Sequence, residues 1–170
     1  MLKINLKSAV LTLLVIASSI PIASYSKDQT MGFFLEKKCL FSGFSGVLVD
    51  KGSPLANVEL HRKVEYRDKL YEDKVITDKD GRFTFESLWV RPIIDDIDQF
   101  AAHQYIKTHT IDSEILIWRG GKLDPKEHAE FGYKIKNSIC DISNTLKTMN
   151  SNPASNGIVI SICEITEKGI

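Results

Sequence analysis

The fold is decided by residues 46–60, GVLVDKGSPLANVEL, and residues 77–85, TDKDGRFTF. In both stretches apolar and polar residues alternate with a period of two, which is typical of strands that bury one face. The Gly-Ser-Pro and Asp-Gly sequences are turn signals, because glycine accepts a positive φ and aspartate bonds nearby backbone amides. The sequence therefore predicts turns between short strands, with Phe83 and Phe85 on one buried face.

The same alternation continues on both sides of these stretches. Residues 105–111, 114–118 and 158–162 are further short runs rich in β-branched and aromatic residues. Several short strands separated by turn signals are typical of two stacked sheets. We therefore expect a mostly β chain that folds as an antiparallel β-sandwich.

One appended α-helix is predicted near residues 125–136. Asp124 supplies an N-cap acceptor, Pro125 suits the first helical position, and Glu127 complements the helix dipole. Its buried side is formed either by Ala129, Tyr133 and Lys136 or by Phe131 and Ile135. Residues 144–157 are rich in asparagine and are predicted to be a solvated loop.

The run from Gly46 to Phe85 resembles the carboxypeptidase regulatory-like and Cna B-type domains, which share a G-x-P-L-x-x-V-x-V and T-D-x-x-G-x-F-x-F pattern. The resemblance implies a prealbumin-like (transthyretin-like) β-sandwich. The segments after residue 88 look like a bacterial family of small exported domains of unknown function, which has no established activity. The generic modules act as spacers, adhesin stalk units or accessory domains that bind protein or glycan.

The first 26 residues have the order of a cleavable signal peptide. Lys3 and Lys7 precede an apolar run at 9–17, and small residues follow it up to Ser26. The run is about half of the roughly 20 apolar residues that span a bilayer, so a retained anchor is the weaker alternative. We expect cleavage after Ser24 or Ser26, which makes the protein periplasmic or secreted, with no stable membrane span.

The remaining chain has the size of one domain. The whole sequence has 170 residues, of which 43% are hydrophobic, and this suits a single core. We expect a lead-in at 27–39 and a single β-sandwich domain at 40–170.

Three cysteines remain after the predicted cleavage: Cys39, Cys140 and Cys163. In an oxidising compartment, one disulfide and one spare thiol are expected. Three pairings are open, and we favour Cys140 with Cys163 because both lie in the C-terminal part and could link neighbouring strands. The alternative is that all three are buried and reduced.

Several function classes are excluded by composition and motifs. The 22 basic and 22 acidic residues give a formal net charge of +0 without a basic face, so nucleic acid is not an expected partner. A calcium loop that starts at Asp78 would need an acidic residue where Trp89 stands. The histidines lack zinc spacing, and there is no Gly-x-Ser-x-Gly elbow. We expect no metal, no cofactor and no enzymatic activity.

Aromatic residues beside charges are the expected binding residues. Tyr66 and Tyr71 flank a charged Arg-Asp-Lys sequence, where a hairpin tip would expose them, whereas Trp118 is expected in the core. Aromatic side chains bury a large area at low entropic cost. The predicted partner-binding residues are Tyr66, Arg67, Tyr71 and Trp89.

These observations predict a non-enzymatic exported module that binds a protein partner in the cell envelope. Its sharpest form is an immunity-type protein that neutralises a secreted effector or toxin. The alternative is a carbohydrate- or cell-envelope-binding accessory domain that uses exposed aromatics as stacking platforms. The sequence predicts no particular oligomeric state.

Overall fold

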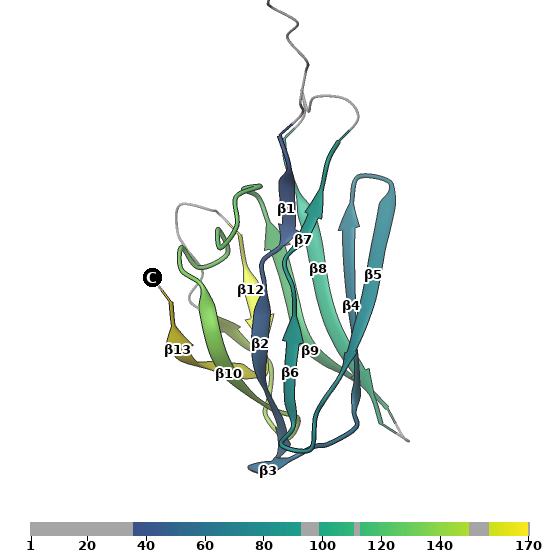
Figure 1. Cartoon of the computed structure of the whole chain (residues 1–170), viewed down its shortest axis with the longest axis vertical. Coiled ribbons are helices and arrows are strands. Elements are labelled where there is room, and N and C mark those ends of the chain that lie inside the picture. Colours follow the sequence, from purple (N-terminus) through teal and green to yellow (C-terminus); the bar gives the residue numbers. More distant parts are fainter. Residues whose placement is uncertain (1–35, 93–98, 111–112, 150–156, 170) are drawn as a thin grey trace, which may run out of the picture. The chain divides into compact units, whose positions relative to one another are not determined.

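A computed structural model describes residues 36–92, 99–110, 113–149 and 157–169 (Figure 1). Within these ranges every regular element is a strand. The strands are β1 (Lys38–Phe41), β2 (Phe44–Asp50), β3 (Ser53–Pro54), β4 (Glu59–Tyr66), β5 (Lys69–Ile76), β6 (Arg82–Phe85), β7 (Leu88–Val90), β8 (Ala102–His109), β9 (Glu114–Lys122), β10 (Ile135–Asp141), β11 (Lys147–Met149), β12 (Val159–Ser161) and β13 (Cys163–Lys168). The expected signal peptide lies outside the described residues.

The strands form two main sheets. The six-stranded sheet has the order β11-β12-β9-β8-β4-β5, and the five-stranded sheet has the order β13-β10-β2-β3 with β6 also paired to β2. Strands β1 and β7 form a separate, short antiparallel pair. Residues 42–43, which lie between β1 and β2, are called the β1–β2 break. The β2–β10 pair is parallel, so the expectation of a purely antiparallel arrangement is wrong at this position.

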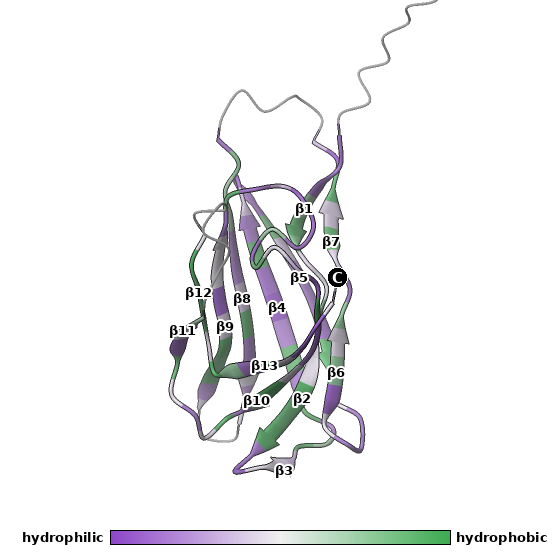
Figure 2. Ribbon diagram, turned by 90° about the vertical axis from the view of Figure 1, so that its left-hand side faces the viewer, coloured by the Kyte–Doolittle hydropathy of each residue, from purple (hydrophilic) through white to green (hydrophobic). Residues whose placement is uncertain are grey.

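The two main sheets enclose a single hydrophobic core, which gives a sandwich-like arrangement (Figure 1). Trp118 on β9 contacts Phe44 on β2 and Phe41 on β1, with ring centroids 5.0 and 5.6 Å apart. Phe83 and Phe85 are both buried, as the alternation predicts, and Trp118 is in the core. Figure 2 shows hydrophobic and hydrophilic bands alternating along β8 and β9, the pattern of strands with one buried face.

The Asp-Gly turn before β6 has the predicted chemistry. One carboxylate oxygen of Asp78 accepts hydrogen bonds from the amides of Asp80 and Arg82, each at 2.8 Å. Gly81 has a φ of 72°, and a β-carbon there would lie 2.6 Å from the Leu48 carbonyl oxygen. Glycine is therefore required by both conformation and space.

The helix predicted near residues 125–136 is wrong. Asp124 does accept a hydrogen bond from the Lys126 amide at 2.8 Å, but the chain then forms turns, with His128 at a φ of 62°. Gly132 also has a positive φ, and Ile135 begins strand β10 between β2 and β13. Local capping signals are thus overridden by pairing with the sheet. In the described part of the chain, no helix could cross a membrane.

The favoured cysteine pairing is present. Cys140 on β10 and Cys163 on β13 are cross-strand partners and form a disulfide, while Cys39 is a buried free thiol. The segment predicted as a loop at 144–157 contains the short strand β11, which pairs with β12. Chain segments 23 residues apart are therefore covalently joined within the five-stranded sheet.

Candidate functional site

A surface pocket lies at the tip of the β4–β5 hairpin. The hairpin pocket has a volume of about 320 Å³ and is lined by Tyr66, Arg67, Asp68, Lys69, Tyr71, Val90, Arg91 and Pro92. The hairpin turns at Arg67, which has a φ of 55°, and β7 supplies the opposite wall. Three of the four predicted binding residues, Tyr66, Arg67 and Tyr71, are thus brought together.

The hairpin pocket combines an apolar floor with a basic rim. Tyr71, Val90 and Pro92 are partly buried and provide the apolar surface. Among the described residues that line the pocket, Arg67, Lys69 and Arg91 are exposed around this floor, and Asp68 is the one acidic residue. A group that has an apolar or aromatic part and a carboxylate would match this arrangement, because guanidinium groups bind carboxylates bidentately.

Tyr66 does not have the exposure expected of it. Its side chain is buried, at 5% relative exposure, and its ring packs against Phe100 with centroids 5.3 Å apart. The Arg67 guanidinium lies 5.6 Å from the Tyr66 ring centroid, within cation–π range. The prediction of an exposed Tyr66 is wrong because alternation on β4 points this residue into the core, and its role is to support the pocket from below.

Trp89 is exposed but lies outside the hairpin pocket. Its exposure is 41%, and it is the cross-strand partner of Cys39 in the β1–β7 pair. Val90, the next residue, lines the hairpin pocket, so strand alternation directs Trp89 to the opposite side of β7.

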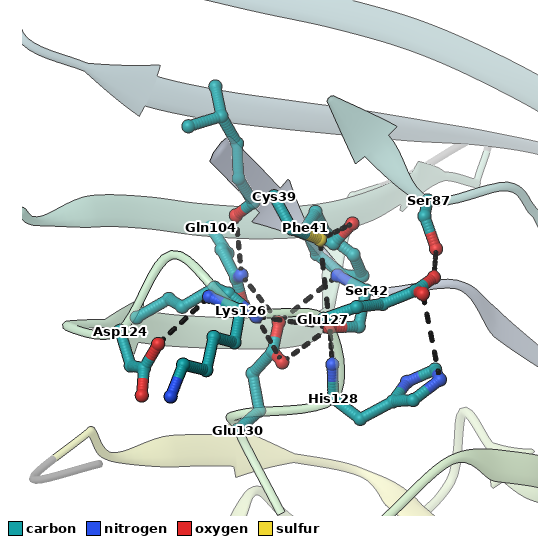
Figure 3. Close-up of polar contacts among 12 residues, drawn as sticks. Cys39, Phe41, Ser42, Ser87, Gln104, Asp124, Lys126, Glu127, His128 and Glu130 are labelled. Carbon is teal, nitrogen blue, oxygen red and sulfur yellow. Dashed lines mark hydrogen bonds and ion pairs between the residues drawn. The ribbon is translucent and has the colours of Figure 1, made fainter. Parts of the chain in front are cut away.

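A second group of polar residues is buried between β8, β9 and the 123–134 segment, and we call it the buried network (Figure 3). Lys122 is fully buried and its Nζ lies 2.6 Å from Glu130 Oε2. Ser42 Oγ donates to the same oxygen at 2.6 Å, and its amide donates to Glu130 Oε1 at 3.1 Å. Gln104 Nε2 also donates to Glu130 Oε1, at 3.0 Å.

Every charge in the buried network has a compensating partner. Burial raises the pKa of the Glu130 carboxyl, but the Lys122 charge and the hydrogen bonds from Lys122, Ser42 and Gln104 outweigh it and hold that pKa below its usual range. The His128 amide donates to Ser42 Oγ at 2.7 Å, which ties the 123–134 segment to the β1–β2 break. The network therefore fixes the 123–134 segment against the β1–β2 break, and its polar groups are used within the fold rather than for binding a ligand.

The sequence does not indicate this network, because its members are far apart in the chain. Ser42 and Glu130, for example, are separated by 88 residues. The local feature that indicates the network is a lysine at an inward-facing position of β9. Lys122 continues the alternation of buried residues in that strand, where a charged side chain is rare unless it is paired.

Cys39 lies beside the buried network and is not a reactive thiol. Burial raises its pKa to about 11, although the Lys122 charge acts in the opposite direction. Its Sγ donates to the Phe41 carbonyl at 3.3 Å. A thiol of this kind is protonated at neutral pH and shielded from reagents.

Ser87, Glu127 and His128 meet at the surface near this segment, but not as a nucleophilic triad (Figure 3). Ser87 Oγ donates to Glu127, and the other oxygen of Glu127 lies 3.9 Å from His128 Nε2. The carboxylate thus stands between the serine and the histidine, whereas activation of a serine requires the imidazole to take its proton.

The outer surface of the six-stranded sheet carries a shallow depression of about 480 Å³, lined by charged residues and by His61 and His109. Its lysines are each paired with a carboxylate: Lys63 with Glu72 at 2.8 Å, Lys74 with the neighbouring Glu59 at 2.7 Å, and Lys107 with Glu114 at 2.6 Å. Among the described residues no group of three or more histidine, cysteine or acidic side chains could hold a metal ion. The hairpin pocket remains the better candidate site, because its described lining combines exposed cations with an apolar floor.

Fold and site together define an all-β, disulfide-linked domain with a surface pocket at one hairpin tip. The comparisons place it more closely: residues 44–145 match the family described as Domain of unknown function (DUF6795), and the chain belongs to this family. The matched range includes the motif at 46–85, but the family carries no carboxypeptidase regulatory-like or Cna B-type name. No curated protein and no solved structure matches the chain.

Proposed function

We propose that this protein is an exported, non-enzymatic module of prealbumin-like fold that binds a protein partner in the cell envelope through its hairpin pocket. The observation that carries the proposal is the pocket itself, where an apolar floor is bordered by Arg67, Lys69 and Arg91. The complementary surface on the partner is an apolar side chain flanked by carboxylates.

Export is supported by two independent features. The first 26 residues have the order of a signal peptide, and Cys140 and Cys163 form a disulfide of the kind that persists in oxidising compartments. Intact-mass analysis of the protein from a periplasmic fraction tests this. A mature N-terminus after Ser24 or Ser26 is the expected result, and an unprocessed chain in the cytosol contradicts it.

The sharpest form of the proposal is an immunity-type role, in which the partner is a toxin or effector that reaches the periplasm. The gene for this protein should then lie beside a larger toxin gene. The protein should co-purify with the toxin at a ratio of about 1:1, because a stable specific interface survives purification.

The site is tested by one charge reversal and one matched control. Arg67→Glu reverses a cation on the pocket rim and should abolish co-purification, whereas Lys79→Glu makes the same change at the exposed Asp-Gly turn and should leave it intact. Loss of the partner in both variants, or in neither, would remove the hairpin pocket from the proposal.

The alternative function is carbohydrate or envelope binding, which the Tyr71 ring in the hairpin pocket favours as a stacking platform. Retention on cell-wall or polysaccharide resin that is lost in Tyr71→Ala supports this alternative. Turnover of a substrate by the purified protein, without either kind of binding, contradicts both proposals.

A further inference from the structure

Strand β5 is an unusually open sheet edge. It is the last strand of the six-stranded sheet and, in the described part of the chain, it pairs only with β4. Its register with β4 is uninterrupted over Lys69–Ile76, and it contains neither proline nor glycine. Long regular edges of this kind accept another strand unless they are protected.

Other edges of the two main sheets are shorter or less regular. At the far end of the six-stranded sheet, β11 has 3 residues. In the five-stranded sheet, β3 has 2 residues and includes Pro54, and β13 pairs with β10 through two register shifts. Short length, proline and an irregular register limit edge-to-edge association, and β5 has none of these three; its protective features are the charged side chains of Lys69, Glu72, Asp73 and Lys74.

The free side of β5 can be assigned from the hydrogen bonds at its end. The Thr77 amide donates to the Val58 carbonyl at 3.0 Å, so Thr77 directs its backbone groups towards the strand that leads into β4. Backbone groups alternate in direction along an antiparallel strand. The residues that direct theirs towards the open edge are therefore Leu70, Glu72, Lys74 and Ile76.

The side chains of these four residues share the outer face of the sheet and read apolar, acidic, basic, apolar. Leu70 is 52% exposed and Ile76 is 60% exposed, which is high for large aliphatic side chains. Glu72 and Lys74 lie between them and are also exposed. This order is self-complementary when the strand is reversed.

We propose that β5 pairs antiparallel with β5 of a second copy of this chain, with the two-fold axis at Asp73. In this register Glu72 of each copy lies opposite Lys74 of the other, and Leu70 lies opposite Ile76. Moving the axis to Glu72 or to Lys74 would place like charges opposite each other, which is unfavourable. The charges on the outer face therefore favour the axis at Asp73 over these two alternatives.

The inner face of β5 agrees with the same register. Tyr71 of one copy lies opposite Val75 of the other, an aromatic and β-branched pair of the kind that stabilises sheets. At the axis Asp73 lies opposite Asp73 of the second copy. Each Asp73 carboxylate already accepts a hydrogen bond from Arg62 Nε of its own chain at 2.8 Å. The central carboxylates are therefore compensated by two buried guanidinium groups.

The existing surface ion pairs would continue across the contact. Glu72 already pairs with Lys63, and Lys74 pairs with Glu59. Charges of opposite sign therefore alternate across the contact: Lys63 and Glu72 of one copy are followed by Lys74 and Glu59 of the other. Since the strands run in opposite directions, the two hairpin tips lie at opposite ends of the paired strands. The inference rests on the β5 edge and does not depend on the proposed function.

The test is the oligomeric state of the purified, disulfide-bonded chain, measured by sedimentation without any partner from about 1 µM to about 1 mM, a range suited to a micromolar contact. The chain should dimerise reversibly. Glu72→Lys and Lys74→Glu should each raise the dimer Kd at least about tenfold, because two attractive pairs become repulsive. An equimolar mixture of these two variants should recover dimers, since their β5 charges again match.

A second variant tests the backbone. Lys74→Pro removes an amide that points to the open edge without removing a bond to β4, and it should make the chain monomeric while its circular dichroism is unchanged. The proposal is overturned if the unmodified chain is monomeric over the whole range. It is also overturned if dimers persist in Lys74→Pro, or if mixing the two charge variants gives no recovery.

Discussion

The buried network and the hairpin pocket are both built around cations, yet the surroundings of those cations differ. Lys122 is enclosed and faces Glu130, with hydrogen bonds from Ser42 and Gln104 completing the set. In the hairpin pocket, the side chains of Arg67, Lys69 and Arg91 are exposed at the rim of an apolar floor. Buried charges that compensate each other hold the fold, whereas exposed cations beside an apolar surface can be contacted by a partner.

The largest expected effect comes from breaking the buried network. Lys122→Met leaves the Glu130 carboxylate buried without its cation, and should lower the free energy of unfolding by about 3–5 kcal/mol. Denaturant unfolding measures this. Adding Glu130→Gln should restore much of the loss, and equal destabilisation by the single and double variants would show that the ion pair is not the cause.

The next effect concerns the disulfide between β10 and β13. Replacing Cys140 and Cys163 together by alanine frees a loop with a sequence separation of 23 and should cost about 3 kcal/mol. Urea unfolding of the oxidised protein and of the double variant gives the difference. A difference below about 1 kcal/mol would mean that pairing between β10 and β13 suffices without the bond.

A smaller effect on stability, but a large one on binding, is expected in the hairpin pocket. Arg67→Glu should weaken partner binding at least about tenfold while changing the free energy of unfolding by less than about 1 kcal/mol, because its side chain is exposed. Titration calorimetry and unfolding on the same preparation separate the two. If stability falls as much as in Lys122→Met, the rim is structural and the comparison fails.

The smallest effect is a dependence of stability on pH. The folded-state pKa of Glu130 is lowered, so its ionised form stabilises the protein fully above the pKa of an unfolded glutamate, about 4.3. This contribution is lost as the pH falls from there through the folded-state pKa. Unfolding between neutral pH and pH 3 should show a steeper acid loss in the natural protein than in Lys122→Met/Glu130→Gln; equal slopes contradict the assignment.

Local chemistry made part of the fold predictable. The Asp-Gly turn, the burial of Phe83 and Phe85 and the core position of Trp118 follow from alternation and turn residues that lie close together in the chain. The Cys140–Cys163 pairing was predictable only as a preference, because the spacing does not show that β10 and β13 are neighbours.

Other features depend on contacts that are distant in sequence. Asp124 and Pro125 carry valid helix-start signals, but the segment is drawn into turns that place Glu130 against Lys122 and bring Ile135 into the sheet. Tyr66 was expected at an exposed tip, yet the register of β4 and the ring of Phe100 bury it. No sequence pattern other than the lysine at the buried position 122 indicated the buried network.

In-cell photo-crosslinking shows directly whether the hairpin pocket is the binding surface. A photo-reactive phenylalanine derivative is placed at Arg67 in one strain and at Lys79, on the distant Asp-Gly turn, in another. Position 67 should crosslink to one envelope protein and position 79 to none. Crosslinking from position 79 alone, or the same product from both positions, would show that the hairpin pocket is not the binding surface.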